Sequence, residues 1–483
     1  MNKQAKALLT LSLIALAVAS VIMAFTLDSY SLLVFSFFAL AVVVGVGLNI
    51  LIGLSGQISF GHIAFYAIGA YVSALLTMQG FSLWLALPAA GLVCAIAGGL
   101  LAIPALRVNG PYLAMITIAF ALVVHHGLVE WRSLTGGANG LMGIPMPSLG
   151  DTDPAILLAL ISSALMLGAL LFFQLLRNSG WGRAMRAVKA SEIAARSLGF
   201  NPVQTKTLAF ALSALLTGMA GAVVSPLMMF INPASFPFTQ SILFVLAVIV
   251  GGAGTVLGPV LGALLIVLLP EALSGAAEYR LLIFSGLLLG VLWVAPRGLL
   301  GSAARLWLKP ATQPAPEQAD LDQLNRFFAS AQTSNGLEVT DISIRFGGVQ
   351  AAKDVSFSAP PGSITSIIGP NGAGKTTVLN MISGFYAPNS GSIKLDDEVA
   401  GLPAWRLARA GIARTYQTTQ LFGELSVLDN LLAGMQQGHL GNIIKAASRQ
   451  QHELALQLLA LVGYRGSINT LADELPHVDR RLV

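Results

Sequence analysis

The sequence predicts a polytopic α-helical membrane domain followed by a smaller α/β domain in the same chain. Of the 483 residues, 55% are hydrophobic and only 10% are charged, whereas charged residues make up about 25% of soluble domains. Charged residues are sparse and mostly basic before residue 310, and they are frequent and slightly acidic after it. This uneven distribution indicates a membrane-embedded front part and a water-exposed back part.

Basic residues in the front part lie mainly beside apolar segments. The isoelectric point of 9.4 therefore indicates positively charged loops at a membrane rather than a nucleic-acid surface, and we expect no nucleic-acid partner. Cys94 is the only cysteine and lies in an apolar stretch. The sequence thus excludes a disulfide framework and a cysteine metal site.

Apolar segments that can cross a lipid bilayer occur throughout the front part. A hydrocarbon core of about 30 Å requires about 20 helical residues. The first six predicted spans are Ala7–Leu27, Ser31–Ile52, Phe60–Gln79, Ser82–Ile103, Pro111–Val129 and Ala155–Leu176.

The loops between these spans indicate their orientation. The loop after the sixth span contains one acidic residue, Glu192, whereas the loop before that span contains Asp151 and Asp153. Basic loops stay in the cytoplasm, so we expect the loop after the sixth span there. Its basic residues are Arg177, Arg183, Arg186, Lys189, Arg196 and Lys206.

The last membrane segments are predicted at Thr207–Phe230, Ser241–Leu269 and Leu281–Val294. The glycines of Gly251–Gly254 interrupt the long middle stretch. Reading it as two short segments gives about ten membrane segments and leaves the chain in the cytoplasm after the last one. Such a break is tolerated where it is buried in protein or lines a cavity, so we expect a broken or re-entrant hairpin.

A change of composition separates the two domains. The segment KPATQPAPEQAD, which begins at Lys309, is rich in Pro, Ala and Gln and is typical of an interdomain linker. We therefore expect the transmembrane domain over residues 1–308, the linker over 309–336 and the α/β domain over 337–483.

A phosphate-binding motif lies in the α/β domain. Ser363–Ile368 has strand character, Val378–Ile382 has helix character, and the residues between them match G-x-x-x-x-G-K-[ST]. In this context the backbone N–H groups bind phosphates, Lys375 reaches the β- and γ-phosphates, and the Thr376 hydroxyl binds Mg²⁺. We therefore expect ATP and Mg²⁺ here rather than a simple Gly-rich turn. The predicted contacts are Gly369, Asn371, Gly372, Ala373, Gly374, Lys375, Thr376 and Thr377.

The GPNGAGKTT wording of this motif resembles the Walker A loop of ATP-binding cassette (ABC) proteins. The resemblance implies that Phe346, in Arg345-Phe346-Gly347-Gly348, stacks on adenine; without it Phe346 would be a core aromatic residue. Downstream, Arg414-Thr415-Tyr416-Gln417 is similar to the Q-loop. This implies that Gln417 contacts Mg²⁺ and the attacking water.

The end of the sequence departs from the cassette pattern. Leu475–Asp479 stands where the family has its LSGGQ signature, and the serine and glycines are absent. The Walker B aspartate, catalytic glutamate, D-loop and switch histidine of the family lie further on. We therefore expect an incomplete P-loop NTPase domain with no assigned catalytic residue, which binds ATP far better than it hydrolyses it. A fragment of a longer protein and a degraded cassette both remain open.

The membrane half resembles the M-type permease of bacterial branched-chain amino-acid ABC importers. The matching blocks are Gly47–Ile50, Gly53–Gln57, Phe65–Tyr71, Thr135–Gly140, Val250–Thr255 and Pro296–Leu299. With a G-type cassette behind it, this implies an inner-membrane importer subunit. Urea, amides or other amino acids remain alternative cargoes, and a chain that only binds nucleotide and assists assembly is an alternative role.

The same resemblance implies the partners. These are an H-type permease subunit, a second ABC ATPase subunit, a periplasmic amino-acid-binding protein and the lipid bilayer. Ser191–Gly199 resembles the coupling helix of importer permeases, with an ordinary amphipathic loop as the alternative. A secondary transporter or channel with an unrelated tail is disfavoured by this segment and by the complete Walker A motif.

Polar residues inside the predicted spans allow two interpretations. Asn49, Gln57 and His62 lie in or beside spans, where polar groups are costly and often face a transport pathway. The neighbouring glycines permit close helix packing. A pathway and helix–helix hydrogen bonding both remain open.

Overall fold

The computed structural model describes residues 3–105, 111–272, 279–295, 298–307, 313–316, 318–329, 336–416 and 419–483. Internal contacts divide the chain into two compact units. The first contains residues 1–177 and 206–311, and the second contains residues 178–205 and 312–483. The basic loop between the spans therefore groups with the C-terminal domain.

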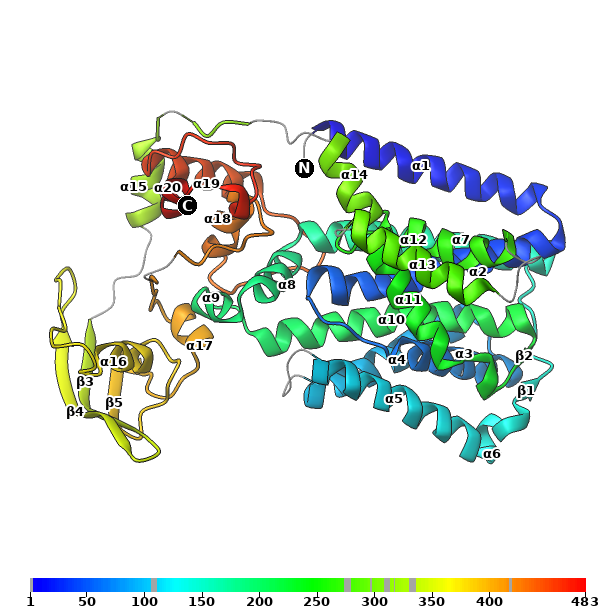
Figure 1. Ribbon diagram of the computed structural model, residues 1–483, viewed down its shortest axis with the longest axis horizontal. Coiled ribbons are helices and arrows are strands. Elements are labelled where there is room, and N and C mark those ends of the chain that lie inside the picture. Colours follow the sequence, from blue (N-terminus) through cyan, green and yellow to red (C-terminus); the bar gives the residue numbers. More distant parts are fainter. Residues whose placement is uncertain are drawn as a thin grey trace. The chain divides into compact units, whose positions relative to one another are not determined.

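The first unit is a bundle of apolar helices (Figure 1). Among the described residues, seven helices are long and apolar enough to cross a membrane, so the expected membrane domain is present. The count of about ten segments stays a prediction. The helices are α1 (Lys3–Thr26), α2 (Ser29–Asn49), α3 (His62–Met78), α4 (Leu83–Ala105), α5 (Pro111–Glu130), α7 (Pro154–Asn178), α10 (Pro202–Met228), α11 (Phe238–Gly251), α12 (Gly258–Ala272), α13 (Arg280–Val294) and α14 (Leu299–Trp307).

Short elements connect these helices on one side of the bundle. The strands β1 (Leu141–Met142) and β2 (Phe230–Ile231) pair antiparallel. The small helices α6 (Arg132–Thr135), η2 (Gly137–Asn139) and η3 (Pro233–Ser235) lie beside them in the chain. Gly136 and Gly140 adopt φ of +74° and +73°, a conformation that glycine takes without strain.

One apolar stretch is broken into two helices, and another helix changes its winding near its end. The apolar stretch predicted to break at its glycines does so, because α11 ends at Gly251 and α12 begins at Gly258. The helix α2 continues as a π-helical turn over Ile50–Leu54, after which the chain is irregular as far as α3.

Side-chain hydrogen bonds hold the interrupted segments in place. The Asn49 amide nitrogen donates to the Thr255 carbonyl at 2.7 Å, and the Gly254 N–H donates to the Asn49 side-chain oxygen at 2.6 Å. His62 Nε2 lies 2.7 Å from the Ser213 hydroxyl. Both polar residues are fully buried. Asn49 bonds to the backbone between α11 and α12, and His62 bonds to Ser213 of α10.

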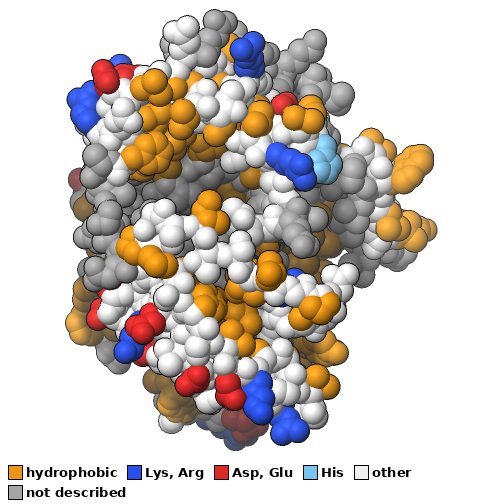
Figure 2. Space-filling view, turned by 90° about the vertical axis from the view of Figure 1, so that its left-hand side faces the viewer, with side chains coloured by type: hydrophobic (Ala, Val, Ile, Leu, Met, Phe, Trp, Pro, Cys, Tyr) orange, Lys and Arg blue, Asp and Glu red, His pale blue; other side chains and the backbone are white. Residues whose placement is uncertain are grey.

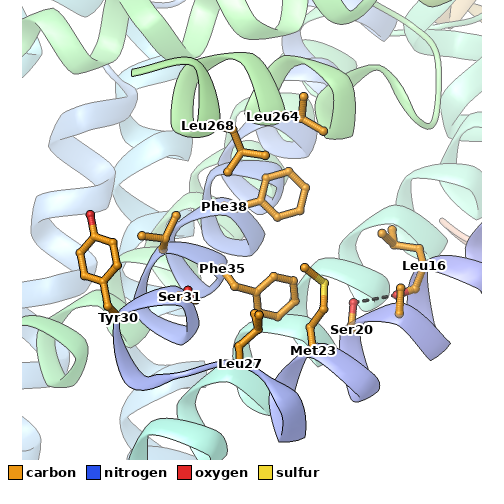
Figure 3. A pocket seen from close by; sticks show the side chains of 12 residues that line it. Leu16, Ser20, Met23, Leu27, Tyr30, Ser31, Phe35, Phe38, Leu264 and Leu268 are labelled. Atoms are coloured by element: carbon orange, nitrogen blue, oxygen red, sulfur yellow. Dashed lines mark hydrogen bonds between the residues drawn. The ribbon is translucent and has the colours of Figure 1, made fainter. Parts of the chain in front are cut away.

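An apolar cavity of about 460 Å³ lies between α1, α2 and α12 (Figure 3). Its lining includes Met23, Phe35, Phe38, Leu264 and Leu268. The Ser20 hydroxyl donates to the Leu16 carbonyl within α1 and therefore presents no free donor to the cavity. The cavity offers apolar contacts, whereas the polar groups at the helix breaks belong to other parts of the bundle.

The second unit contains an antiparallel sheet in the order β4-β3-β5-β6. The strands are β3 (Leu337–Phe346), β4 (Val349–Ala359), β5 (Ser390–Leu395) and β6 (Asp397–Glu398), and α16 (Lys375–Ile382) packs beside them (Figure 1). Buried Val339, Ile342, Ile393, Val378 and Met381 join the sheet to α16. On the face drawn in Figure 2, acidic and basic side chains lie next to each other among small apolar groups.

The strand predicted at Ser363–Ile368 does not form. The segment has no regular secondary structure, and Ile364 and Ile368 are 97% and 91% exposed. A strand requires a hydrogen-bonded neighbour, and no described strand pairs with this segment. The prediction of a strand from the β-branched composition of this segment is therefore wrong.

Helices form the rest of the second unit. They are α8 (Gly180–Ala190), α9 (Glu192–Ser197), α15 (Leu321–Ala329), α17 (Ala404–Arg409), α18 (Val427–Met435), α19 (Arg449–Leu461), η5 (Ala472–Glu474) and α20 (His477–Leu482).

Part of the expected linker packs onto these helices. The Ala315 N–H donates to the Gly466 carbonyl at 3.2 Å, and the Ile468 N–H donates to the Gln313 carbonyl at 3.0 Å. Ala315 is 6% exposed and joins an apolar cluster with Leu459 and Tyr464. The described part of this segment is thus attached to the C-terminal domain.

Candidate functional site

The predicted phosphate-binding loop leads directly into α16. Gly374 is the N-cap residue of this helix, with φ of +82°, and Gly372 has φ of +83°. A Cβ on Gly374 would collide with the Ala351 carbonyl oxygen, so only glycine fits there. The loop exposes the helix N-terminus, where unpaired N–H groups and the helix dipole favour an anion.

Lys375 folds back over this loop. Its ammonium group donates to the carbonyl oxygens of Gly369 and Pro370, both at 2.7 Å. The Ala373 N–H donates to the Pro370 carbonyl at 3.2 Å, which closes the turn. The positive charge therefore lies at the mouth of the loop, within reach of an anion that binds there.

Thr376 lines a cavity of about 490 Å³. Leu379, Ile412, Arg414 and Tyr416 are among the other lining residues. Asn371, Gly372 and Ala373 are exposed in the loop, and Thr377 is half-buried in α16. Of the predicted ligands among the described residues, only Thr376 lines this cavity, and the loop residues before it lie outside the lining.

Phe346 lies at the end of β3, where its ring is 45% exposed. The Tyr386 ring packs against it edge to face, with centroids 5.0 Å apart and an interplanar angle of 69°. The Asn389 side chain accepts a hydrogen bond from the Arg345 N–H at 2.7 Å. Tyr386 and Asn389, which the sequence analysis missed, thus brace the position of Phe346.

Gln417 lies outside the described residues, whereas Arg414 and Tyr416 lie within them. Arg414 Nη1 donates to the Asn380 side-chain oxygen on α16 at 2.7 Å and to the hydroxyl of Ser383, the C-cap residue of α16, at 2.6 Å. The Arg414 guanidinium lies 5.4 Å from the centroid of the Tyr416 ring. Arg414 therefore links the helix of the phosphate loop to the segment that precedes Gln417.

The coupling-type segment forms α9 and packs against the cassette elements of the same unit. Ser191 caps α9 by accepting from the Ala194 N–H, and the Ser197 hydroxyl is hydrogen-bonded to the Tyr416 hydroxyl. Buried residues from both sides form one apolar cluster. They are Ala184, Ala187 and Val188 on α8, Ala194 and Ala195 on α9, Phe200 just after the segment, and Phe422, Leu425 and Ala433 on the cassette.

Charged groups extend this contact along α8. Lys189 Nζ lies 2.8 Å from the Glu424 carboxylate, and Arg186 lies 3.7 Å from the Asp429 carboxylate. Burial lowers the pKa of the neighbouring Arg183 guanidinium, and the Asp429 charge partly opposes that shift. Two of the six basic residues in the loop predicted to be cytoplasmic, Arg186 and Lys189, thus contact acidic residues of the cassette.

Two family models match the chain. The model described as "Branched-chain amino acid transport system / permease component" matches residues 30–293, and the model described as "ABC transporter" matches residues 352–477. The first match covers more than half of the chain.

Curated relatives match the two halves separately. The high-affinity branched-chain amino acid transport system permease protein LivM of Salmonella typhimurium is 35% identical over 316 residues, which cover 60% of this chain and 74% of LivM. The ATP-binding protein LivG of Escherichia coli is 40% identical over 155 residues, which cover 30% of this chain and 61% of LivG. The corresponding protein BraF of Pseudomonas aeruginosa is 47% identical over 105 residues, which cover 22% of this chain and 41% of BraF.

The chain thus spans less than two thirds of the length of these ATP-binding relatives. The permease match precedes the cassette match in the sequence. In the structure, most of the apolar helices likewise precede the phosphate loop. The chain therefore belongs to the family of branched-chain amino acid transport permease components, and it carries an ATP-binding cassette of the ABC transporter type on the same polypeptide.

Proposed function

We propose that this chain is the permease and ATP-binding part of an importer that moves branched-chain amino acids across the bacterial inner membrane. The observation that carries the proposal is the packing of α9 on the cassette beside the segment that precedes Gln417. Ser197 of α9 contacts Tyr416, and Arg414 connects that segment to α16. A change at the nucleotide loop thus has a short route to the coupling-type segment.

ATP and Mg²⁺ are the proposed ligands of the cassette. Lys375 would exchange its bonds to the Gly369 and Pro370 carbonyls for bonds to phosphate oxygens. The exposed N-terminus of α16 supplies further N–H donors. Thr376 and Gln417 are the proposed Mg²⁺ ligands, and Phe346 is the proposed adenine platform. The remaining proposed phosphate contacts are Gly369, Asn371, Gly372, Ala373, Gly374 and Thr377.

The proposed cargo is a leucine-like amino acid. The permease relative and both ATP-binding relatives belong, by name, to high-affinity branched-chain amino acid transport. The interrupted helices offer neutral polar groups to a zwitterion, including the Gln57 side-chain oxygen, which is buried and has no hydrogen-bond partner among the described residues. Such breaks supply a weakly selective polar route, so we assign most of the selectivity to a periplasmic binding protein.

The same proposal requires further subunits. An ABC importer uses two permease halves and two cassettes, and this chain supplies one of the former and cassette elements of the latter. We therefore propose an H-type permease subunit and a second ABC ATPase subunit as partners. The periplasmic amino-acid-binding protein would deliver cargo from the other side of the membrane.

Uptake of radiolabelled cargo tests the proposal. We expect a strain without the gene to lose high-affinity leucine uptake and to keep uptake of urea and phenylalanine. Loss of urea uptake with leucine uptake intact would contradict the proposed cargo but would still agree with the proposed class of transporter. Unchanged uptake of all three compounds would contradict the proposed importer.

A further inference from the structure

Arg409, at the end of α17, binds both sides of the contact between the coupling-type segment and the cassette. Its Nε donates to the Gly199 carbonyl at 3.0 Å, and its Nη2 donates to the Gly438 carbonyl at 2.8 Å. Gly199 ends the coupling-type segment, whereas Gly438 follows α18 of the cassette. One planar guanidinium therefore joins two carbonyl groups that come from distant parts of the sequence.

Close packing of two glycines makes this geometry specific. Gly199 and Gly438 adopt φ of +83° and +76°, a conformation that other residues rarely adopt. A Cβ on Gly438 would collide with the Gly199 carbonyl oxygen and would lie 2.5 Å from Arg409 Nε. The two backbones thus approach so closely that no Cβ fits on Gly438, and the Arg409 guanidinium is hydrogen-bonded to both of them.

The neighbouring Arg406 provides an internal comparison. Arg406 and Arg409 lie on the same helix and stack over the same Trp405 ring, at 5.1 Å and 4.9 Å from its centroid. Among the described residues, only Arg409 of the pair is hydrogen-bonded to the coupling-type segment. Burial also lowers the pKa of Arg409, which agrees with its place inside the contact.

We propose that Arg409 is the positioning residue that clamps the coupling-type segment to the cassette, by holding the Gly199 and Gly438 carbonyls together. Separation of α9 from the cassette must break the charge-assisted hydrogen bond from Arg409 to Gly199, whereas the bond to Gly438 lies within the cassette and holds the guanidinium in place. The clamp deepens the proposed coupling role, but it does not depend on the identity of the cargo.

Thiol labelling of the full chain in lipid nanodiscs tests the clamp. Ala195 is fully buried in the apolar cluster between the segment and the cassette, so Ala195→Cys reacts with a maleimide only when the contact opens. The native chain sets the background, because its single Cys94 is buried. We expect Arg409→Ala to raise the labelling rate of Ala195→Cys about five- to tenfold, and Arg406→Ala to leave the rate unchanged.

Two glycine variants provide an independent check. Gly438→Ala should raise the rate as Arg409→Ala does, whereas Gly434→Ala, whose Cβ meets nothing within 4 Å, should leave it unchanged. Equal rates in the Arg409 and Arg406 variants would overturn the proposal, and so would rapid labelling of Ala195→Cys in the otherwise native chain. Because the assay reports docking alone, loss or retention of leucine uptake does not affect its outcome.

Discussion

Lys375 lies at the mouth of the predicted nucleotide loop. Its ammonium binds two backbone carbonyls, so phosphate binding replaces one set of charge-assisted bonds with a stronger one between opposite charges. Lys375→Ala should weaken ATP binding by about 1.5–3 kcal/mol, or roughly ten- to a hundredfold in Kd.

Titration of the full chain with a fluorescent ATP analogue measures this effect. Lys353→Ala is the matched control, because Lys353 is an exposed lysine of the same domain on β4. Equal affinities of the two variants would exclude a phosphate role for Lys375.

Phe346 should contribute to ATP binding only through its contact with the adenine base. Its exposed ring at the end of β3, braced by Tyr386, suits stacking, which is worth about 1–3 kcal/mol per base. We expect Phe346→Ala to weaken ATP binding and to leave the binding of inorganic tripolyphosphate unchanged. Calorimetry with both ligands separates the outcomes, because a parallel loss for tripolyphosphate would mean that Phe346 supports the loop instead.

At the scale of elements, α15 attaches the segment that precedes the sheet to the rest of the cassette. Leu324 is 2% exposed, whereas Leu321 on the same helix is 59% exposed. The Asp320 N–H also donates to the Gln457 side chain at 2.7 Å. The helix α15 thus contacts α19, with Leu324 as a buried side chain and a hydrogen bond just before its start.

Leu324→Ala should loosen this attachment. Removing a buried leucine side chain costs about 2–5 kcal/mol, whereas a change at an exposed position usually stays within about 0.5 kcal/mol. Amide hydrogen exchange over residues 318–329 should therefore accelerate in Leu324→Ala and stay unchanged in Leu321→Ala. Similar exchange in both variants would show that α15 is not fastened through Leu324.

Local sequence predicted the elements whose geometry is local. The glycines before Lys375 lie at a turn, and the glycines after Val250 lie at a helix break, as expected. Such positions can be predicted locally because glycine adopts positive φ without steric cost, whatever its distant neighbours are. The strand at Ser363–Ile368 failed because a strand also needs a neighbour. The roles of Arg409 and Tyr386 could not be predicted from the sequence, because their partners, Gly199 and Phe346, lie far away in it.

At the scale of the whole molecule, the chain order and the contact pattern differ. The expected domain boundary at residue 308 follows the chain, whereas residues 178–205 group with the cassette. The docked loop lies between two permease helices, α7 and α10. We propose that this chain connection transmits movement of the cassette elements to the two helices.

Leucine uptake with a disabled nucleotide loop tests this account most directly. A strain without the gene would be complemented with the native chain, with Lys353→Ala or with Lys375→Ala, and uptake of radiolabelled leucine would be measured at equal membrane abundance. The account predicts that the native chain and Lys353→Ala restore uptake, whereas Lys375→Ala does not. Full uptake with Lys375→Ala would show that nucleotide binding at this loop does not drive the permease.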